Sequence, residues 1–408
     1  MDWALIRAQP GAGAIIGRSR SGQSLAVRVP PEAGATWIAI EPRGWVSRDD
    51  VTSDGSSPEM LRRRATVARR DAPLPYHYGF SPRVPHYRFV PTRSQQVHEE
   101  RHLDPRQRPL PPLDDADEHE ALWGPLFASR EVPLRDGRDE ANKSVWASTI
   151  SLGGQRWHVT PAHTLIPAHR VEPAPPVRSP ARRLPRLPFI FANGQNPGRA
   201  RVFRKTRAGH YRGYRYLPRW SFIPLPQGPN WTNSPFGDLV AIADDVWLLD
   251  HEVSTFVRDP LPPDLAPGEK WVSIHLARQT LVAYRGDQPV FATAISSGAD
   301  GATGRHRTNF GSFRLREKWL TQDMGGSDGG VGWRSPEVPY IAYYDAGGRA
   351  LHGAWWHEWF GRPRSHGCVN LSPADAHWLF DWTEPRLPRG WHSVIAEPES
   401  GTRIVIQR

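Results

Sequence analysis

Proline restricts the folding of this chain more than any other residue. The 408 residues include 42 prolines and 36 glycines, and a proline in a helix interior or a central strand removes a backbone hydrogen bond. The pattern therefore favours small β-rich domains, turns and extended linkers over a long helical bundle. At roughly 150 residues per domain, the length predicts two to four domains.

The chain is basic, with 52 Lys and Arg against 42 Asp and Glu and a formal net charge of +10. The arginines are scattered between acidic residues, and we find neither an aromatic-plus-basic stripe nor zinc-finger spacing. We therefore expect no nucleic-acid partner and a basic surface that faces an anionic polymer. The absence of a run of about 18 apolar residues predicts no integral membrane segment. Residues 1–4 carry no leader pattern, so we expect either a cytosolic protein or a leader removed before this numbering begins.

Three segments in the first 260 residues share one spacing. They start at Trp37, Trp157 and Leu239; a second hydrophobic pair follows eight residues later, and a valine lies fourteen residues after each start. Short apolar runs separated by polar turns predict β-hairpins. The first copy, together with residues 5–10, resembles a bacterial SH3-type small barrel, and the other two copies are more divergent. Such modules bind cell-wall polymer or act as spacers, or they only pack against a catalytic domain.

Proline-rich stretches suggest the domain boundaries. Residues 92–118 and 172–188 are predicted to be loops or extended linkers, and 261–268 form a third boundary. We expect an SH3-like module at 1–56, a Pro/Arg-rich linker or insertion at 57–125, degenerate β-modules at 126–175 and 186–260, and a C-terminal domain at 268–408.

From Lys270 onward the alternation of apolar and polar residues becomes regular. Alternating apolar residues predict strands over 272–276, 281–284, 290–295, 310–315, 340–344 and 350–353. One helix is signalled by Ser372 as N-cap, Pro373 at its first position and Asp375 completing a capping box. The predicted fold class is mainly β: a β-sandwich-like domain with one short helix, preceded by small barrels.

The chain has a single cysteine, Cys368, within Ser365-His366-Gly367-Cys368-Val369-Asn370. One cysteine excludes an intramolecular disulfide and any zinc module built on two to four cysteines. A thiol of ordinary pKa, ~8.5, needs a base or a positive field to become a thiolate at neutral pH. His352 and His366 are candidates for that base. Gly353 and Gly367 keep backbone amides accessible to an oxyanion.

These residues resemble the L,D-transpeptidases with a YkuD-type catalytic domain. The signature of that family is a histidine followed, a dozen or more residues later, by Ser/Thr-His-Gly-Cys-hydrophobic-Asn. Here His352 is followed by the motif at 365–370, and the resemblance extends over about residues 269–408. The chain departs from the family at Thr308-Asn309-Phe310-Gly311, where most members carry Thr-Pro-x-Gly.

The resemblance implies a role for each motif residue. Cys368 would be the nucleophile, His352 its general base, and the Gly353 carbonyl would orient the imidazole. The backbone amides of His366, Gly367 and Cys368 would line the oxyanion hole. Ser365 and Asn370 would hold the turn.

The resemblance also implies the reaction. The enzyme would attack a peptidoglycan stem tetrapeptide, release D-alanine, and pass the acyl group to an amine of a neighbouring stem or to water. It would need no cofactor, react with carbapenems, and work in the periplasm or cell envelope, and we expect a monomer. The alternatives are an L,D-carboxypeptidase and a non-catalytic cell-wall-binding scaffold.

Residues 319–339 resemble the mobile lid of the family, or form an ordered glycine-rich loop. Tyr340, Trp333, Trp356 and His357 are possible substrate-lid residues. His352 and His357 are five residues apart, which fits neither helical nor strand geometry for a zinc pair, so we expect no metal.

Overall fold

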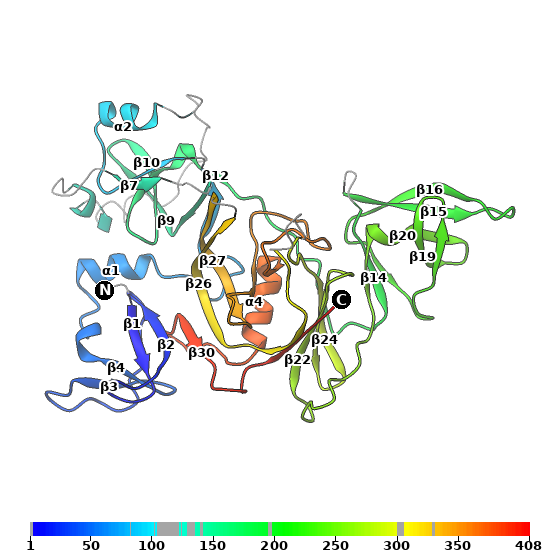
Figure 1. The fold of residues 1–408 in the computed structure, drawn as a ribbon. Coiled ribbons are helices and arrows are strands. Elements are labelled where there is room, and N and C mark those ends of the chain that lie inside the picture. Colours follow the sequence, from blue (N-terminus) through cyan, green and yellow to red (C-terminus); the bar gives the residue numbers. More distant parts are fainter. Residues whose placement is uncertain are drawn as a thin grey trace. The chain divides into compact units, whose positions relative to one another are not determined.

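The computed structural model describes residues 3–81, 83–101, 103, 122–123, 125–128, 135–138, 142–194, 198–299, 306–328 and 331–408. The described residues are mainly β, with small sheets and short helices (Figure 1). They form two compact units. Unit 1 comprises 1–176, 317–341 and 386–395, and unit 2 comprises 177–316, 342–385 and 396–408. No helix of the described residues is long and apolar enough to cross a membrane.

Unit 1 is built from short antiparallel strands. Its elements are β1 (Trp3–Arg7), β2 (Ile15–Arg20), β3 (Trp37–Ala39), β4 (Trp45–Ser47), η1 (Arg48–Asp50), α1 (Pro58–Ala65), β5 (His77–Phe80), β6 (Pro85–Tyr87), α2 (Arg93–Glu100), β7 (Arg135–Arg138), β8 (Lys143–Trp146), β9 (Ser148–Leu152), β10 (Gln155–Val159), β11 (Leu165–Pro167), η2 (Ala168–Arg170), β12 (Glu172–Pro173), β26 (Glu317–Asp328), most of β27 (Val331–Tyr343) and β30 (Ser393–Ile395). Its sheets have the strand orders β27-β26-β30-β2-β1-β4-β3, β7-β6-β11-β10-β9 and β12-β5-β8.

Unit 2 holds the third module and most of the C-terminal region. Its elements are β13 (Arg182–Arg183), β14 (Phe189–Ala192), β15 (Arg199–Lys205), β16 (Tyr211–Pro218), β17 (Phe222–Pro224), β18 (Trp231–Ser234), β19 (Gly237–Ala243), β20 (Val246–Leu249), η3 (Asp250–Glu252), β21 (Val253–Phe256), β22 (Lys270–His275), β23 (Thr280–Arg285), β24 (Gln288–Ala294), β25 (Gly311–Arg314), β28 (Ala350–Gly353), β29 (Val369–Leu371), α4 (Pro373–Trp382) and β31 (Arg403–Gln407). Its sheets have the orders β13-β24-β23-β22-β31-β25, β17-β14-β21 and β16-β15-β20-β19-β18, and β28 lies between β29 and the end of β27.

The spacing repeat folds the same way in all three copies. Each copy is an antiparallel strand pair in one register: Trp37 pairs with Ser47, Trp157 with Pro167, and Leu239 with Leu249. A single 3₁₀ turn follows each pair, and the closing valine ends it by donating its amide to the first residue of that turn. The predicted hairpins are confirmed, whereas an SH3-type barrel stays a prediction.

Two sequence expectations about local structure have different outcomes. The helix expected after the cysteine is confirmed as α4, and the Ser372 hydroxyl accepts a hydrogen bond of 3.2 Å from the Asp375 amide. The loop expected over 92–118 is wrong at its start, where α2 forms behind a capping box of Thr92 and Gln95. That Thr-x-x-Gln signal was present in the sequence. Residues 104–118 lie outside the described residues.

The hairpin of β26 and β27 belongs to unit 1, although its sequence lies within the region expected to be catalytic. Strand β30 pairs with β26 on one side and with β2 on the other, where Gly17 is opposite Val394. A side chain at Gly17 would meet the Trp391 ring at 2.4 Å, so only glycine permits this close packing. The N-terminal strands thus continue a sheet that the C-terminal region begins.

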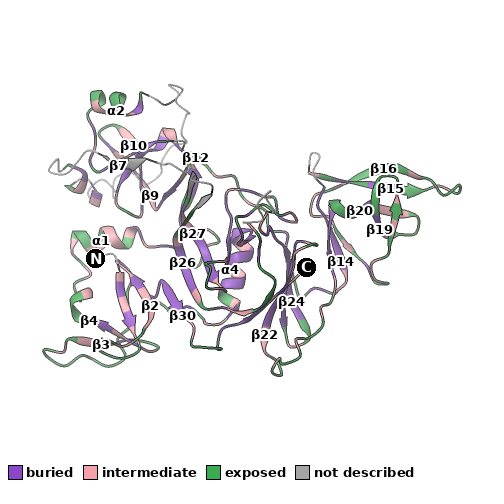
Figure 2. Ribbon diagram, in the orientation of Figure 1, coloured by how far each residue is buried: buried purple, intermediate pink, exposed green. Residues whose placement is uncertain are grey.

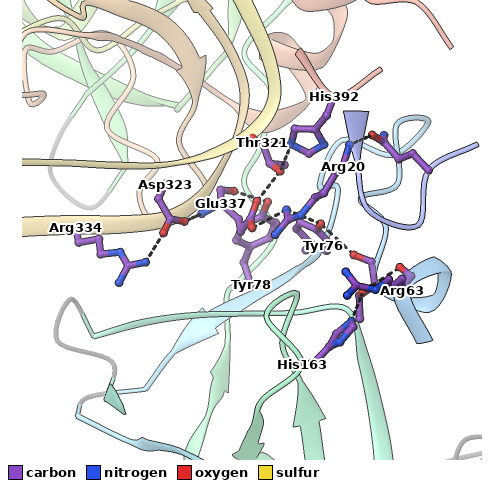
Figure 3. Close-up of polar contacts among 12 residues, drawn as sticks. Arg20, Arg63, Tyr76, Tyr78, His163, Thr321, Asp323, Arg334, Glu337 and His392 are labelled. Atoms are coloured by element: carbon purple, nitrogen blue, oxygen red, sulfur yellow. Dashed lines mark hydrogen bonds and ion pairs between the residues drawn. The ribbon is translucent and has the colours of Figure 1, made fainter. Parts of the chain in front are cut away.

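A buried polar cluster fixes this hairpin against the N-terminal half of unit 1 (Figure 3). Arg20 Nη1 lies 2.7 Å from Glu337 Oε1, and both side chains are mostly buried. Thr321 donates to Glu337 Oε2 at 2.6 Å, and the Tyr78 hydroxyl donates to the Glu337 carbonyl at 2.8 Å. Glu337 adopts a φ of 44°, a strained conformation that persists only where neighbours hold it. His392 donates to the Thr321 carbonyl at 2.8 Å.

In unit 2, the third module and the C-terminal sheet share one hydrophobic core. Phe189 stacks on Phe256 with ring centroids 4.4 Å apart, and Trp271 stacks on Tyr284 at the same distance. These four side chains belong to a single buried cluster. Figure 2 shows the buried residues concentrated in strands such as β14, β22 and β24 and in α4, whereas β16 is exposed along most of its length.

The Arg20–Glu337 ion pair leads to a prediction about stability. Glu337→Ala leaves a guanidinium buried without its partner, so we expect the free energy of unfolding to fall by about 3 kcal/mol. The matched control is Arg334→Gln, which removes a guanidinium that is 70% exposed from Asp323 on the same hairpin and should cost less than about 1 kcal/mol. Urea unfolding of both variants measures the difference, and equal losses would contradict the assignment.

A second prediction concerns acid stability. Burial lowers the pKa of His392 from 6.5 to about 3, so the folded chain keeps this imidazole neutral. The unfolded chain takes up a proton below pH 6.5, and the free energy of unfolding should therefore fall by about 1.4 kcal/mol per pH unit between 6.5 and 3. His392→Gln should remove this contribution, while His377→Gln should keep it. Unfolding at pH 7 and pH 5 tests this, and an unchanged pH slope in His392→Gln would refute it.

Candidate active site

The pairing of two short parallel strands creates the site. In β28 and β29, His352 lies opposite Asn370 and Leu351 opposite Val369. Residues two apart on a strand share a face, so Cys368, directly before β29, is placed on the same side as Asn370 and His352. The structure therefore brings the predicted nucleophile and base onto neighbouring strands.

Cys368 is partly exposed, and protein surrounds most of its side chain. Burial is the largest influence on the thiol and raises its pKa to about 11. The backbone amide of Ala350 and the charge of Arg349 oppose this shift, and the charge of Asp345 adds to it. At neutral pH the resting group is a thiol, so its reaction requires a base that removes the proton during attack.

His352 lies next to the last residue of β28 and is buried. Its Nδ1 lies 3.2 Å from the Gly353 carbonyl oxygen. A carbonyl only accepts, so this contact places the proton on Nδ1 and makes Nε2 the basic nitrogen of the neutral ring. The Trp356 ring lies 5.9 Å from the imidazole, centroid to centroid.

The turn before the cysteine is fixed by hydroxyl groups. Ser365 donates to the Cys368 carbonyl and accepts from the Gly367 amide at 3.1 Å. Gly367 has a φ of 118°, which a residue with a side chain rarely adopts, and its carbonyl accepts from Thr308 at 2.9 Å. Thr308 also accepts from the Gly298 amide at 2.8 Å, so the departure from the family pattern at 308–311 keeps a residue that holds this turn.

Asn370 and His357 form a buried link behind the site. The Asn370 amide group lies 3.0 Å from His357 Nε2, and the Trp359 backbone amide donates to His357 Nδ1 at 3.1 Å. Since Nδ1 accepts, the neutral ring carries its proton on Nε2, and the amide atom that faces it must be the Asn370 oxygen. His357 therefore orders the loop that follows His352.

The third module holds the same loop. Arg219 donates to the Phe360 carbonyl at 3.2 Å, to the Glu358 carbonyl, and to Asn193 Oδ1 at 3.2 Å. A cavity of about 300 Å³ adjoins this contact and is lined by Asn193, Gly194, Gly198, Arg219, Glu358, Trp359 and Arg362. Arg219 thus connects a residue of the third module to the segment beside the site.

Of the remaining predicted residues, the structure describes the surroundings of Tyr340 and His366. Tyr340 is buried in unit 1, where its hydroxyl donates to the Ala72 carbonyl. The side chain of Trp333 lies outside the described residues, and His366 is exposed with its ring 4.6 Å from that of His306. Among the described residues, no group of three or more His, Cys, Asp or Glu is arranged to hold a metal ion.

Three residues of the thiol environment are not predicted from the sequence. Asp345 and Arg349 form an ion pair of 3.1 Å in the turn before β28, and both act on the pKa of Cys368. The buried Tyr344 hydroxyl has no hydrogen-bond partner among the described residues, and the charge of Cys368 helps raise its pKa. The signal in the sequence was the pair of opposite charges in Asp345-Ala-Gly-Gly-Arg349, directly before the strand that carries His352.

Comparisons with known proteins identify one family for the C-terminal region. Residues 269–406 match the YkuD family model, the L,D-transpeptidase catalytic domain. The C-terminal region of this chain therefore carries a YkuD-type catalytic domain, and small β-modules precede it. No curated protein matches the chain.

Solved structures include similar chains. An L,D-transpeptidase from Xylanimonas cellulosilytica is 28% identical, with 36% of this chain and 64% of that chain covered and a TM-score of 0.23. One from Stackebrandtia nassauensis is 23% identical over 35% and 57%, with a TM-score of 0.25. L,D-transpeptidase 3 from Mycobacterium tuberculosis, in complex with a faropenem-derived adduct, is 18% identical over 42% and 77%, with a TM-score of 0.28. The chain thus spans less than two thirds of the length of the first two of these proteins.

The charges beside Cys368 lead to a prediction about its titration. Asp345→Asn removes a charge that raises the pKa of the thiol, so its alkylation by iodoacetamide should begin at lower pH than in the wild type. Arg349→Gln should shift the profile to higher pH, because it removes the positive charge and leaves Asp345 unpaired. The rate against pH reports Cys368 alone, since the chain has one cysteine. Shifts in the same direction would contradict the assignment.

Proposed function

We propose that this protein is a peptidoglycan L,D-transpeptidase with Cys368 as its nucleophile. The observation that carries the proposal is the parallel register of β28 and β29, which puts His352 beside the strand that follows Cys368. The YkuD match over 269–406 supports the reaction class. The substrate would be a peptidoglycan stem tetrapeptide, and the location would be the periplasm or cell envelope.

The elevated pKa of Cys368 favours proton removal during attack over a resting thiolate. His352 Nε2 would take the thiol proton while Sγ bonds to the carbonyl carbon that precedes the terminal D-alanine. Collapse of the tetrahedral intermediate would break the C–N bond, and the leaving amine would receive the proton from His352. The product would be a thioester on Cys368 and free D-alanine.

The same groups would complete the transfer. An amine of a second stem would lose a proton to His352, attack the thioester and restore the thiol, giving a cross-link; attack by water would give a tripeptide. The Gly367 amide already donates to Ser365, so we assign the oxyanion chiefly to the Cys368 amide, which the Ser365 turn orients. The Gly353 carbonyl would hold the imidazole, in place of a carboxylate.

Variant enzymes test the assignment. With disaccharide-tetrapeptide as substrate, Cys368→Ala should abolish D-alanine release, and His352→Ala should lower kcat/KM by about 10²- to 10⁴-fold. His377→Ala is the matched control, because this histidine lies on α4 and contacts Asp381, and it should retain wild-type activity. Full activity in Cys368→Ala would refute the proposal.

Product masses separate the alternatives. A cross-linked dimer supports transpeptidation, and tripeptide as the main product indicates an L,D-carboxypeptidase. A carbapenem should add its mass to the wild type and not to Cys368→Ala. A folded wild-type protein that shows neither turnover nor acylation would indicate the non-catalytic wall-binding scaffold.

A further inference from the structure

The hairpin of β15 and β16 concentrates positive charge. Residues 199–215 hold seven Lys and Arg and no Asp or Glu. The surrounding segment 177–260 has thirteen Lys and Arg against six Asp and Glu, which gives +7 of the net charge of +10. This corrects the expectation that no aromatic-plus-basic stripe accompanies the charge of the chain.

All seven cations of the hairpin are exposed: Arg199, Arg201, Arg204, Lys205, Arg207, Arg212 and Arg215. None of them forms an ion pair with any residue that the structure describes. Asp244 and Asp245, in the neighbouring turn between β19 and β20, make no ion pair with them either. The charge is therefore uncompensated.

Two of the arginines lie over one tyrosine ring, and a third lies opposite one of them. The guanidinium of Arg204 lies 4.7 Å from the centroid of the Tyr214 ring, and that of Arg215 lies 5.8 Å from it. Arg212 is directly opposite Arg204 in the strand register. We name Arg204, Arg212, Tyr214 and Arg215 the Tyr214 cluster.

Within the Tyr214 cluster, the pairing of Arg212 with Arg204 is unfavourable for folding. Like charges directly opposite each other on antiparallel strands destabilise the pair, and Tyr214 is 55% exposed. The buried residues of β15, Ala200, Val202 and Phe203, supply the packing of the hairpin instead. An exposed cluster that keeps an unfavourable pair of cations is suited to binding an anion.

We propose that the β15–β16 hairpin binds a linear phosphodiester polymer attached to the cell wall, with the Tyr214 cluster as its centre. Guanidinium groups pair with phosphate oxygens through two parallel N–H···O bonds. A ribbon of seven cations matches a ligand that repeats its charge along a chain, whereas a single carboxylate needs only one or two. The wall as the source of the polymer rests on the proposed function.

The state of the aromatic rings favours this ligand over a nucleic acid. Single-stranded nucleic acids bind by stacking bases on open aromatic faces. Here two guanidinium groups already contact the Tyr214 ring, and the Lys205 ammonium lies 5.5 Å from the centroid of the Tyr211 ring. Cations thus already contact the Tyr211 and Tyr214 rings, and Tyr216, which is 55% exposed, is the ring of the hairpin that a base could still stack on.

Binding measurements on the full chain test the proposal in a Cys368→Ala background, so that catalysis plays no part. The probes are synthetic poly(glycerol phosphate) and an oligothymidylate with the same number of phosphates. Arg204→Gln/Arg212→Gln/Arg215→Gln should weaken polymer binding by about tenfold or more. It should also reduce the slope of log Kd against log salt by about two, as expected for three lost phosphate contacts.

The matched control removes the same charge elsewhere. Arg48, Arg285 and Arg389 are exposed and lie outside the hairpin, and their replacement by Gln should change the affinity less than about twofold. An equal loss in this control would overturn the proposal, as would an absence of polymer binding. Tighter binding of the oligothymidylate would overturn it in favour of a nucleic-acid site. Circular dichroism melting verifies that both triple variants fold.

Co-sedimentation with purified cell walls tests the source of the ligand. The chain should sediment with intact walls and lose most of that binding once hydrofluoric acid has removed the phosphodiester polymers. Equal binding before and after treatment would overturn the proposal. D-Alanine release by the triple variant with Cys368 intact reports separately on the proposed function, because the hairpin holds no residue of the active site.

Discussion

The parallel ladder between β28 and β29 is the constraint on which the rest of the site depends. Parallel strands cannot be joined by a tight turn, so a long connection must separate them. Residues 354–368 make that connection, and they carry both the loop after His352 and the turn before Cys368. The hydrogen bonds of His357, Arg219 and Ser365 all order this segment. The polar residues near the thiol therefore act chiefly by holding the register between β28 and β29.

The hairpin of β26 and β27 is held by side chains of unit 1. Strand β27 passes through Glu337, which Arg20 and Tyr78 hold, and ends at Tyr343, which pairs with Ala350 of β28. A segment whose sequence suggests a lid is, over its described residues, part of an ordered sheet.

Local signals in the sequence predicted the strands, helix and hairpins that local interactions determine. The alternation over 272–284 gave β22 and β23, the Ser372-Pro373 pair gave the start of α4, and the fourteen-residue spacing gave three hairpins of one register. The assignment of 317–341 to unit 1 could not be predicted, because it depends on pairing between β30 and β2, nearly 380 residues apart. The influence of Asp345 and Arg349 on Cys368 could not be predicted for a related reason, because it exists only once β28 lies beside β29.

The positive charge of the β15–β16 hairpin is hidden when charge is considered over the whole chain. Over the whole chain, acidic residues follow the arginines closely enough that the charge looks dispersed, yet 199–215 contains none. Strand pairing then brings Arg212 opposite Arg204, so two cations eight residues apart in sequence become neighbours. Their repulsion is tolerated because Val202 and Phe203 are fully buried and anchor β15 from within the module. The two tasks of β15 thus fall to different residues. Its buried residues support folding, and its exposed residues would recognise the ligand.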